Sequence, residues 1–149
     1  MTEPHAPRLN FVTLGVRDLA VSRSFYESLG LTPHAMGNDS VAFFDINGTV
    51  LALFGHDNLA ADAGLAPTPP PAFRGVSRAW NATSDSEADA IFAHALACGA
   101  LAVKQPHKVF WGGYSGYFAD PDGHLWEVAH NPFITIDSNG HVILPATPQ

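Results

Sequence analysis

Residues 116–127 read Gly-Tyr-Phe-Ala-Asp-Pro-Asp-Gly-His-Leu-Trp-Glu, and this stretch decides the fold. Two segments rich in β-forming residues, Tyr114–Ala119 and His124–Ala129, flank the sequence Asp120-Pro121-Asp122-Gly123. Proline presets a turn dihedral, aspartate bonds to nearby backbone amides, and glycine accepts positive φ. The stretch therefore predicts a β-hairpin.

The first half of the chain repeats this pattern. Segments Ser40–Asp45 and Thr49–Phe54 are joined by Ile46-Asn47-Gly48, and Asn-Gly between apolar runs is the strongest short hairpin signal. Aligning the two hairpins sets Asp45 against Asp120 and Gly48 against Gly123. This agreement predicts an internal duplication.

Each hairpin is preceded by a strand, a helix and a further strand. In the first half these are Leu9–Val16, a helix capped by Asp18 and closed by Gly30, and a weaker strand at Leu31–Met36. In the second half they are Gly75–Ala82, a helix that begins at the capping box Ser84-Asp85-Ser86-Glu87 and ends at Gly99, and Leu101–Lys104. The predicted fold is α+β with two βαβββ modules. They span about 8–56 and 74–131, separated by a proline-rich linker of about 57–73 and followed by a hairpin tail of about 132–149.

Composition excludes several classes of partner. The 149 residues carry a formal charge of −7 with only seven Lys and Arg, so nucleic acid is not an expected partner. No apolar run is long enough to span a bilayer, and residues 1–8 lack the features of a secretory signal. The only cysteine, Cys98, cannot form an intrachain disulfide, which favours a soluble cytoplasmic protein.

The two modules resemble the vicinal oxygen chelate superfamily, which includes glyoxalases, bleomycin-resistance proteins and extradiol dioxygenases. Residues 14–19, 24–26 and 29–30 resemble its opening strand and helix, and residues 116–127 resemble its closing hairpin. The resemblance implies curved mixed sheets that form a shared cup for a metal or a ligand, and it implies a homodimer. It implies no single reaction, because members include isomerases, dioxygenases and drug-sequestering proteins.

The metal positions that the resemblance implies are largely lost. The family's ligands fall on Phe11, Ala52, Ser77 and Glu127, and only Glu127 is a usual metal ligand. Divalent metals in such sites need at least three N or O ligands from the protein. The eight histidines show no His-x-His or His-Glu-x-x-His spacing that would rebuild a site. We therefore expect no metal and no other cofactor.

Glu127 is the central candidate residue. Strand alternation places it on the face opposite Trp126 and Val128, pointing into the cup. There it could act as a general base, anchor a ligand, or be a structural remnant bonded to Thr13, Ser77, Asn81 or a tyrosine. The residues expected to line the cup with it are Phe11, Thr13, Ala52, Phe54, Ser77, Trp111, Tyr114 and Tyr117.

Three functions are open at this point. The leading hypothesis is a metal-independent protein that binds a cationic or aromatic small molecule in an apolar cup. The second is an enzyme, either a lyase or isomerase with Glu127 as base or a dioxygenase-type enzyme with a relocated metal. The third is a dimerisation module without a ligand.

Overall fold

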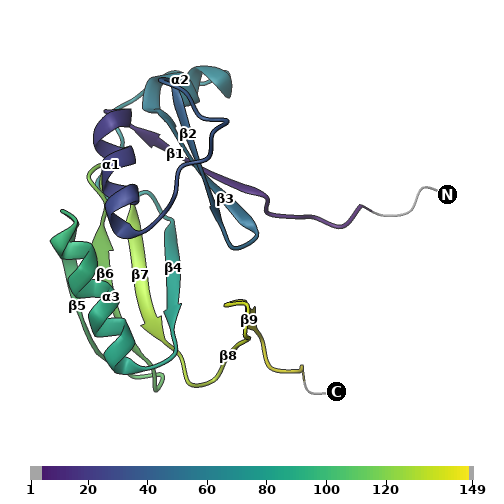
Figure 1. Ribbon diagram of the computed structural model, residues 1–149, viewed down its shortest axis with the longest axis vertical. Coiled ribbons are helices and arrows are strands. Elements are labelled where there is room, and N and C mark those ends of the chain that lie inside the picture. The colour runs from purple at the N-terminus through teal and green to yellow at the C-terminus, as the bar shows by residue number, and fades with distance from the viewer. Residues whose placement is uncertain (1–4, 148–149) are drawn as a thin grey trace.

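Two separate β-sheets form the framework of the protein (Figure 1), whose computed structural model describes residues 5–147. The first sheet has the strand order β1-β3-β2 and the second has the order β4-β7-β6-β5. A short pair, β8-β9, follows. The elements in chain order are β1 (Phe11–Val16), α1 (Leu19–Leu29), β2 (Val41–Ile46), β3 (Thr49–Gly55), α2 (His56–Asp62), β4 (Ser77–Ala82), α3 (Asp85–Ala97), β5 (Leu101–Lys108), β6 (Tyr114–Ala119), β7 (Leu125–His130), β8 (Thr135–Ile136) and β9 (Val142–Ile143).

The strand registers confirm the internal duplication. In each sheet the first strand of the module runs parallel to the last, β1 with β3 and β4 with β7. Thr13 pairs with Ala52 in the first sheet, and Ala79 pairs with Glu127 in the second. Ala52 and Glu127 therefore occupy equivalent positions. The fold is the predicted α+β arrangement.

Both long helices begin at the residues that the sequence predicts. The Asp18 carboxylate accepts hydrogen bonds from the amides of Ala20 and Val21 at the start of α1. At the start of α3 the Ser84 hydroxyl accepts from the Glu87 amide, and the Glu87 carboxylate accepts from Thr83. These contacts satisfy amides that have no partner inside a helix.

Helices α1 and α3 lie on one side of the molecule, on the left in Figure 1, and one hydrophobic core joins both modules there. Tyr26 of α1 is fully buried at this junction. Its hydroxyl donates to Asp120 Oδ2 at 2.6 Å and accepts from Trp126 Nε1 at 3.0 Å. Burial, followed by the neighbouring Asp120, raises the pKa of Tyr26 well above its usual value. The buried phenol thus stays neutral and links the modules.

Three elements differ from the sequence prediction. Helix α2 (His56–Asp62) takes up the first residues of the predicted linker, 57–62, and contains no buried residue. The expected strand Leu31–Met36 is reduced to an isolated bridge between Pro33 and Phe44, because proline has no amide to donate to a ladder. Strand β5 extends to Lys108, beyond the predicted end at Lys104.

The tail forms the predicted extra hairpin, β8-β9. Its turn lies against the turn between β2 and β3, where Asn47 Nδ2 donates to the Asn139 carbonyl at 2.7 Å. The tail therefore connects the end of the second module to the first module. Within residues 5–147, no helix has the length and apolar character that crossing a membrane requires.

Candidate functional site

Glu127 lies on the face of the second sheet that the helices leave uncovered. Its neighbours on β7, Trp126 and Val128, are buried in the helix-side core, and alternation turns Glu127 the other way. Glu127 pairs with Ala79 on one side and with Tyr117 on the other. The Tyr117 hydroxyl donates to Glu127 Oε2 at 2.8 Å. A carboxylate and a phenol thus form a half-buried pair at the centre of the sheet.

The hydrogen bond to Glu127, followed by burial, raises the pKa of Tyr117 above its usual value. Ionising the phenol would remove the donated proton and set two negative oxygens side by side. Tyr117 is consequently a donor toward Glu127 at neutral pH. The pair can accept further hydrogen bonds at the carboxylate and at the phenol oxygen.

A cavity of about 480 Å³ is lined by Tyr117, whereas Glu127 is not among its lining residues. It brings Ser77 and Tyr117 together with Lys104, which sequence reasoning missed. Lys104 pairs with Tyr117 across the β5-β6 ladder. The register of these two strands is the signal that could have indicated it. The remaining lining residues are Phe73, Gly75, Val76, Val103 and Leu125.

The candidate residues of the first module lie on the other sheet. Phe11 is 54% exposed and makes an edge-to-face contact with Phe43, with ring centroids 6.2 Å apart. Ala52 is buried at the centre of that sheet, and Phe54 is half-buried near the end of β3. Thr13 lines a second cavity, of about 380 Å³, together with Leu125. The lining of the cavity beside Tyr117 includes none of these four residues.

The aromatic residues Trp111, Tyr114 and Tyr117 do not converge on Glu127 as expected. The Tyr114 hydroxyl donates to Asp89 Oδ1 of α3 at 2.6 Å, so Tyr114 lies on the helix side and its assignment to the cup is wrong. Trp111 lies in the loop between β5 and β6, with its ring over Gly113, where any Cβ would overlap the indole. Of the three aromatics predicted in this segment, only Tyr117 contacts Glu127.

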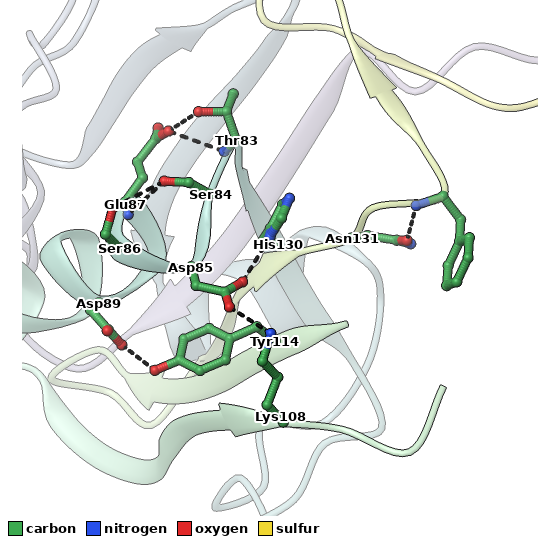
Figure 2. A network of polar contacts seen from close by, with 11 residues as sticks. Thr83, Ser84, Asp85, Ser86, Glu87, Asp89, Lys108, Tyr114, His130 and Asn131 are labelled. Carbon is green, nitrogen blue, oxygen red and sulfur yellow. Dashed lines mark hydrogen bonds and ion pairs between the residues drawn. The ribbon is translucent and has the colours of Figure 1, made fainter. Parts of the chain in front are cut away.

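Figure 2 shows the polar network that holds Tyr114 on the helix side. Asp85 Oδ2 is 2.8 Å from Lys108 Nζ, and Asp85 Oδ1 is 2.8 Å from His130 Nδ1. Lys108, followed by His130, lowers the pKa of Asp85 below its usual value. The network joins the start of α3 to β5 and β7. It also places His130 on the face opposite Glu127, as strand alternation predicts.

The side chains at the four positions where the family resemblance implies metal ligands do not fit a divalent metal. Phe11 offers no ligand atom, Ala52 offers none, and the Ser77 hydroxyl is a weak neutral donor. Across residues 5–147, no three His, Cys, Asp or Glu side chains gather closely enough to hold an ion. The chemistry that this donor set supports is hydrogen bonding and proton exchange at Glu127 and Tyr117.

The protein has two duplicated modules, and in each the first strand pairs in parallel with the last strand of the module. The chain belongs to the Glyoxalase/Bleomycin resistance protein/Dioxygenase superfamily, whose family model matches residues 8–128. This confirms the family resemblance that residues 14–19 and 116–127 indicate.

Similar proteins include enzymes of this family. The chain is 30% identical over 121 residues to the metallothiol transferase FosB of Shouchella clausii (strain KSM-K16), covering 80% of this chain and 77% of that protein. A glyoxalase-related enzyme from Fulvimarina pelagi superposes with a TM-score of 0.86 at 34% identity, covering 95% and 100% of the two chains. A glyoxalase/bleomycin resistance protein/dioxygenase from Nocardioides gives 0.73 at 26% identity, with 86% and 85% covered.

Proposed function

We propose that the protein binds a small molecule, without a metal, in the cavity lined by Tyr117, the hydrogen-bond partner of Glu127. The observation that carries this proposal is a cavity of about 480 Å³ whose lining includes Tyr117, while the Tyr117 hydroxyl donates to Glu127. Small-molecule sites have this range of size and combine apolar walls with a few polar groups. Family membership supports a ligand role but leaves the ligand open.

The polar groups limit the chemistry of the ligand. The carboxyl group of Glu127 has acceptor capacity beyond the hydrogen bond from Tyr117. A cationic or proton-donating group could use it, although a cation would also meet the charge of Lys104, which lines the same cavity. Phe73, Val103 and Leu125 offer apolar surface to the rest of the molecule, which favours an aromatic or aliphatic body. A drug-sequestering role would use the same contacts.

Glu127→Gln tests this function. The substitution removes the charge but keeps an oxygen that accepts from Tyr117, so the melting temperature should stay close to that of the wild type. Binding of a cationic ligand should weaken by about 1.5–3 kcal/mol, the range for hydrogen bonds to charged groups. Thermal shift against a panel of small cationic and aromatic compounds measures both quantities. Glu27→Gln, an exposed change on α1, is the control.

The opposite pattern would retire Glu127 as a functional residue. If Glu127 is a structural remnant, Glu127→Gln lowers the melting temperature and the ligand response of the protein is unchanged. A panel in which no compound shifts the wild-type protein would favour the third function, a module without a ligand.

An enzyme is the second candidate, and the name of the Shouchella clausii relative favours it. Tyr117 and Glu127 could exchange a proton with a bound substrate, Glu127 acting as base. Elemental analysis of the purified protein separates a metal-dependent enzyme from the metal-independent function proposed above. Near-equimolar Zn, Ni, Fe or Mn would contradict metal independence.

We also propose a homodimer in a reducing, cytoplasmic setting. Phe11 on β1, Val103 on β5 and Phe73 in the segment before β4 are large apolar side chains that are more than half exposed. Exposed apolar side chains favour a partner where they form a patch. The reducing setting follows from the single cysteine, Cys98, which has no partner for an intrachain disulfide.

A further inference from the structure

A third cavity, away from Glu127, lies where β1 and β3 end. The last register pair of these parallel strands is Val16 with Gly55, and the chain then turns into Arg17 on one side and His56 on the other. The cavity there has a volume of about 610 Å³. We propose that it binds a small organic anion, a carboxylate or a phosphate ester, through Arg17 and Arg74.

Arg74 is held in place at this cavity by neutral acceptors. Its Nη2 donates to the Asp122 carbonyl at 2.7 Å, and its Nη1 is 3.3 Å from His124 Nδ1. His124 Nε2 is 2.8 Å from the Gly15 carbonyl, so Nε2 carries the proton and Nδ1 accepts from Arg74. These contacts orient the guanidinium, but none of them neutralises its charge.

The arginines at this cavity are unusual in so acidic a chain. The sequence has 14 Asp and Glu against seven Lys and Arg. In residues 5–147, every ion pair uses a lysine or a histidine, and neither Arg17 nor Arg74 lies within ion-pair distance of a carboxylate. A guanidinium is always charged and matches carboxylate and phosphate geometry with two parallel donors. Two arginines that line one cavity without a carboxylate partner favour an anion there.

The walls favour an anion with an apolar body. Pro67, Pro69 and Pro70 of the linker line the cavity together with Val16. Proline loses little conformational freedom when a ligand packs against it, because its φ is already fixed. The volume accommodates a ring or a short aliphatic chain beside the charged group.

Two carboxylates also line the cavity, and they provide an internal test. Asp122 Oδ1 accepts from the Arg17 amide at 2.8 Å, so Asp122 is part of the junction between the modules. Asp57 is largely exposed, and its carboxylate lies 3.0 Å from His56 Nδ1. Asp57 opposes a bound anion without holding the fold together. Removing its charge should therefore strengthen anion binding.

The experiment is isothermal titration calorimetry of the full chain with phenyl phosphate and with benzoate, which separate a phosphate from a carboxylate ligand. Benzyl alcohol is the neutral probe. We expect at least one anion to bind and benzyl alcohol not to bind. Arg17→Gln should weaken the anion about tenfold, the loss expected for one charge-assisted contact, and Asp57→Asn should strengthen it about threefold.

Arg8→Gln, the same charge change outside the cavity, is the matched control and should leave the affinity unchanged. Glu127→Gln should also leave it unchanged, so this inference and the proposed function can fail independently. The inference is overturned if neither anion binds, or if Arg17→Gln and Arg8→Gln weaken binding equally. Circular dichroism of each variant confirms that it is folded.

Discussion

At the residue scale, local rules indicate the helix caps, the face on which Glu127 lies and also the face on which Tyr114 lies, although Tyr114 was expected in the cup. Asp18 and Ser84 bond to amides within three residues, so their roles can be read from adjacent sequence. Tyr114 and Tyr117 are three positions apart on one strand, and alternation alone puts them on opposite faces. The expectation that both tyrosines line the cup followed their aromatic character instead of strand alternation. The position of Lys104 opposite Tyr117 depends on the pairing of β5 with β6, which adjacent sequence does not encode.

The pKa of Tyr117 should fall toward its usual value in the Glu127→Gln variant. The hydrogen bond to the Glu127 carboxylate is the largest cause of the raised pKa, and a neutral amide would no longer repel the phenolate. Phenolate absorbance in an alkaline titration measures this change. Tyr117→Phe identifies which transition belongs to Tyr117.

Tyr114 serves as the internal reference in that titration, because its raised pKa comes chiefly from Asp89. Its transition should be the same in wild type and Glu127→Gln. If the whole titration curve moved together, or no transition moved, the pair of Tyr117 and Glu127 would not be coupled as the geometry indicates.

At the element scale, strands and helices with a strong pattern were predictable, and those with a weak pattern were not. Helix α2 has no side-chain cap and no buried residue, so neither a capping motif nor an apolar period marks it. Strand β5 continues through Pro106, beyond the predicted end at Lys104. Strand β5 is the edge strand of its sheet and pairs only with β6, so a proline in β5 can affect the ladder on one side only.

Gly116→Ala should destabilise the protein because β5 passes very close to β6 at this position. A Cβ on Gly116 would lie 2.6 Å from the Pro106 nitrogen and 2.7 Å from the Lys104 carbonyl oxygen, both backbone atoms. Relieving this overlap requires a backbone shift that costs about 1–3 kcal/mol. Urea denaturation gives the free energy of unfolding.

Gly64→Ala is the control for that variant. Gly64 has a φ of +72° but open space around its Cβ position, so only the backbone conformation opposes the change. Its cost should be about 1 kcal/mol, the usual penalty for alanine in the left-handed region. A Gly116→Ala protein as stable as the wild type would mean that β5 does not approach β6 this closely.

At the scale of the whole molecule, the duplication was predictable and the junction between the modules was not. Two matching hairpins sufficed to infer two modules. The contacts that join them link residues about one hundred positions apart, such as Tyr26 with Asp120 and Gly15 with His124. No local pattern encodes such pairs. The arginine-lined cavity depends on the same junction, so the sequence alone did not indicate it.

The edge strands and exposed faces of the two sheets bear on oligomerisation. Strand β1 is an edge of the first sheet and β4 is an edge of the second, so each module has an open edge and an open face. Open edges and apolar faces favour association with a second copy. Phe11 combines the two features, because it lies on the edge strand β1 and is 54% exposed.

We therefore expect a homodimer that Phe11→Asp splits. Light scattering at micromolar concentration should give twice the 15.9 kDa of one chain for the wild type. A charge at position 11 would have to be desolvated in the dimer, which is costly without a cationic partner, so the variant should approach the monomer mass. Met36→Asp, an equally polar change at a 74% exposed residue between α1 and β2, should remain dimeric.

A wild-type protein that scatters as a 15.9 kDa monomer would contradict the dimer. A Phe11→Asp variant that stays dimeric would move the interface away from β1, since a buried aspartate there could not be tolerated.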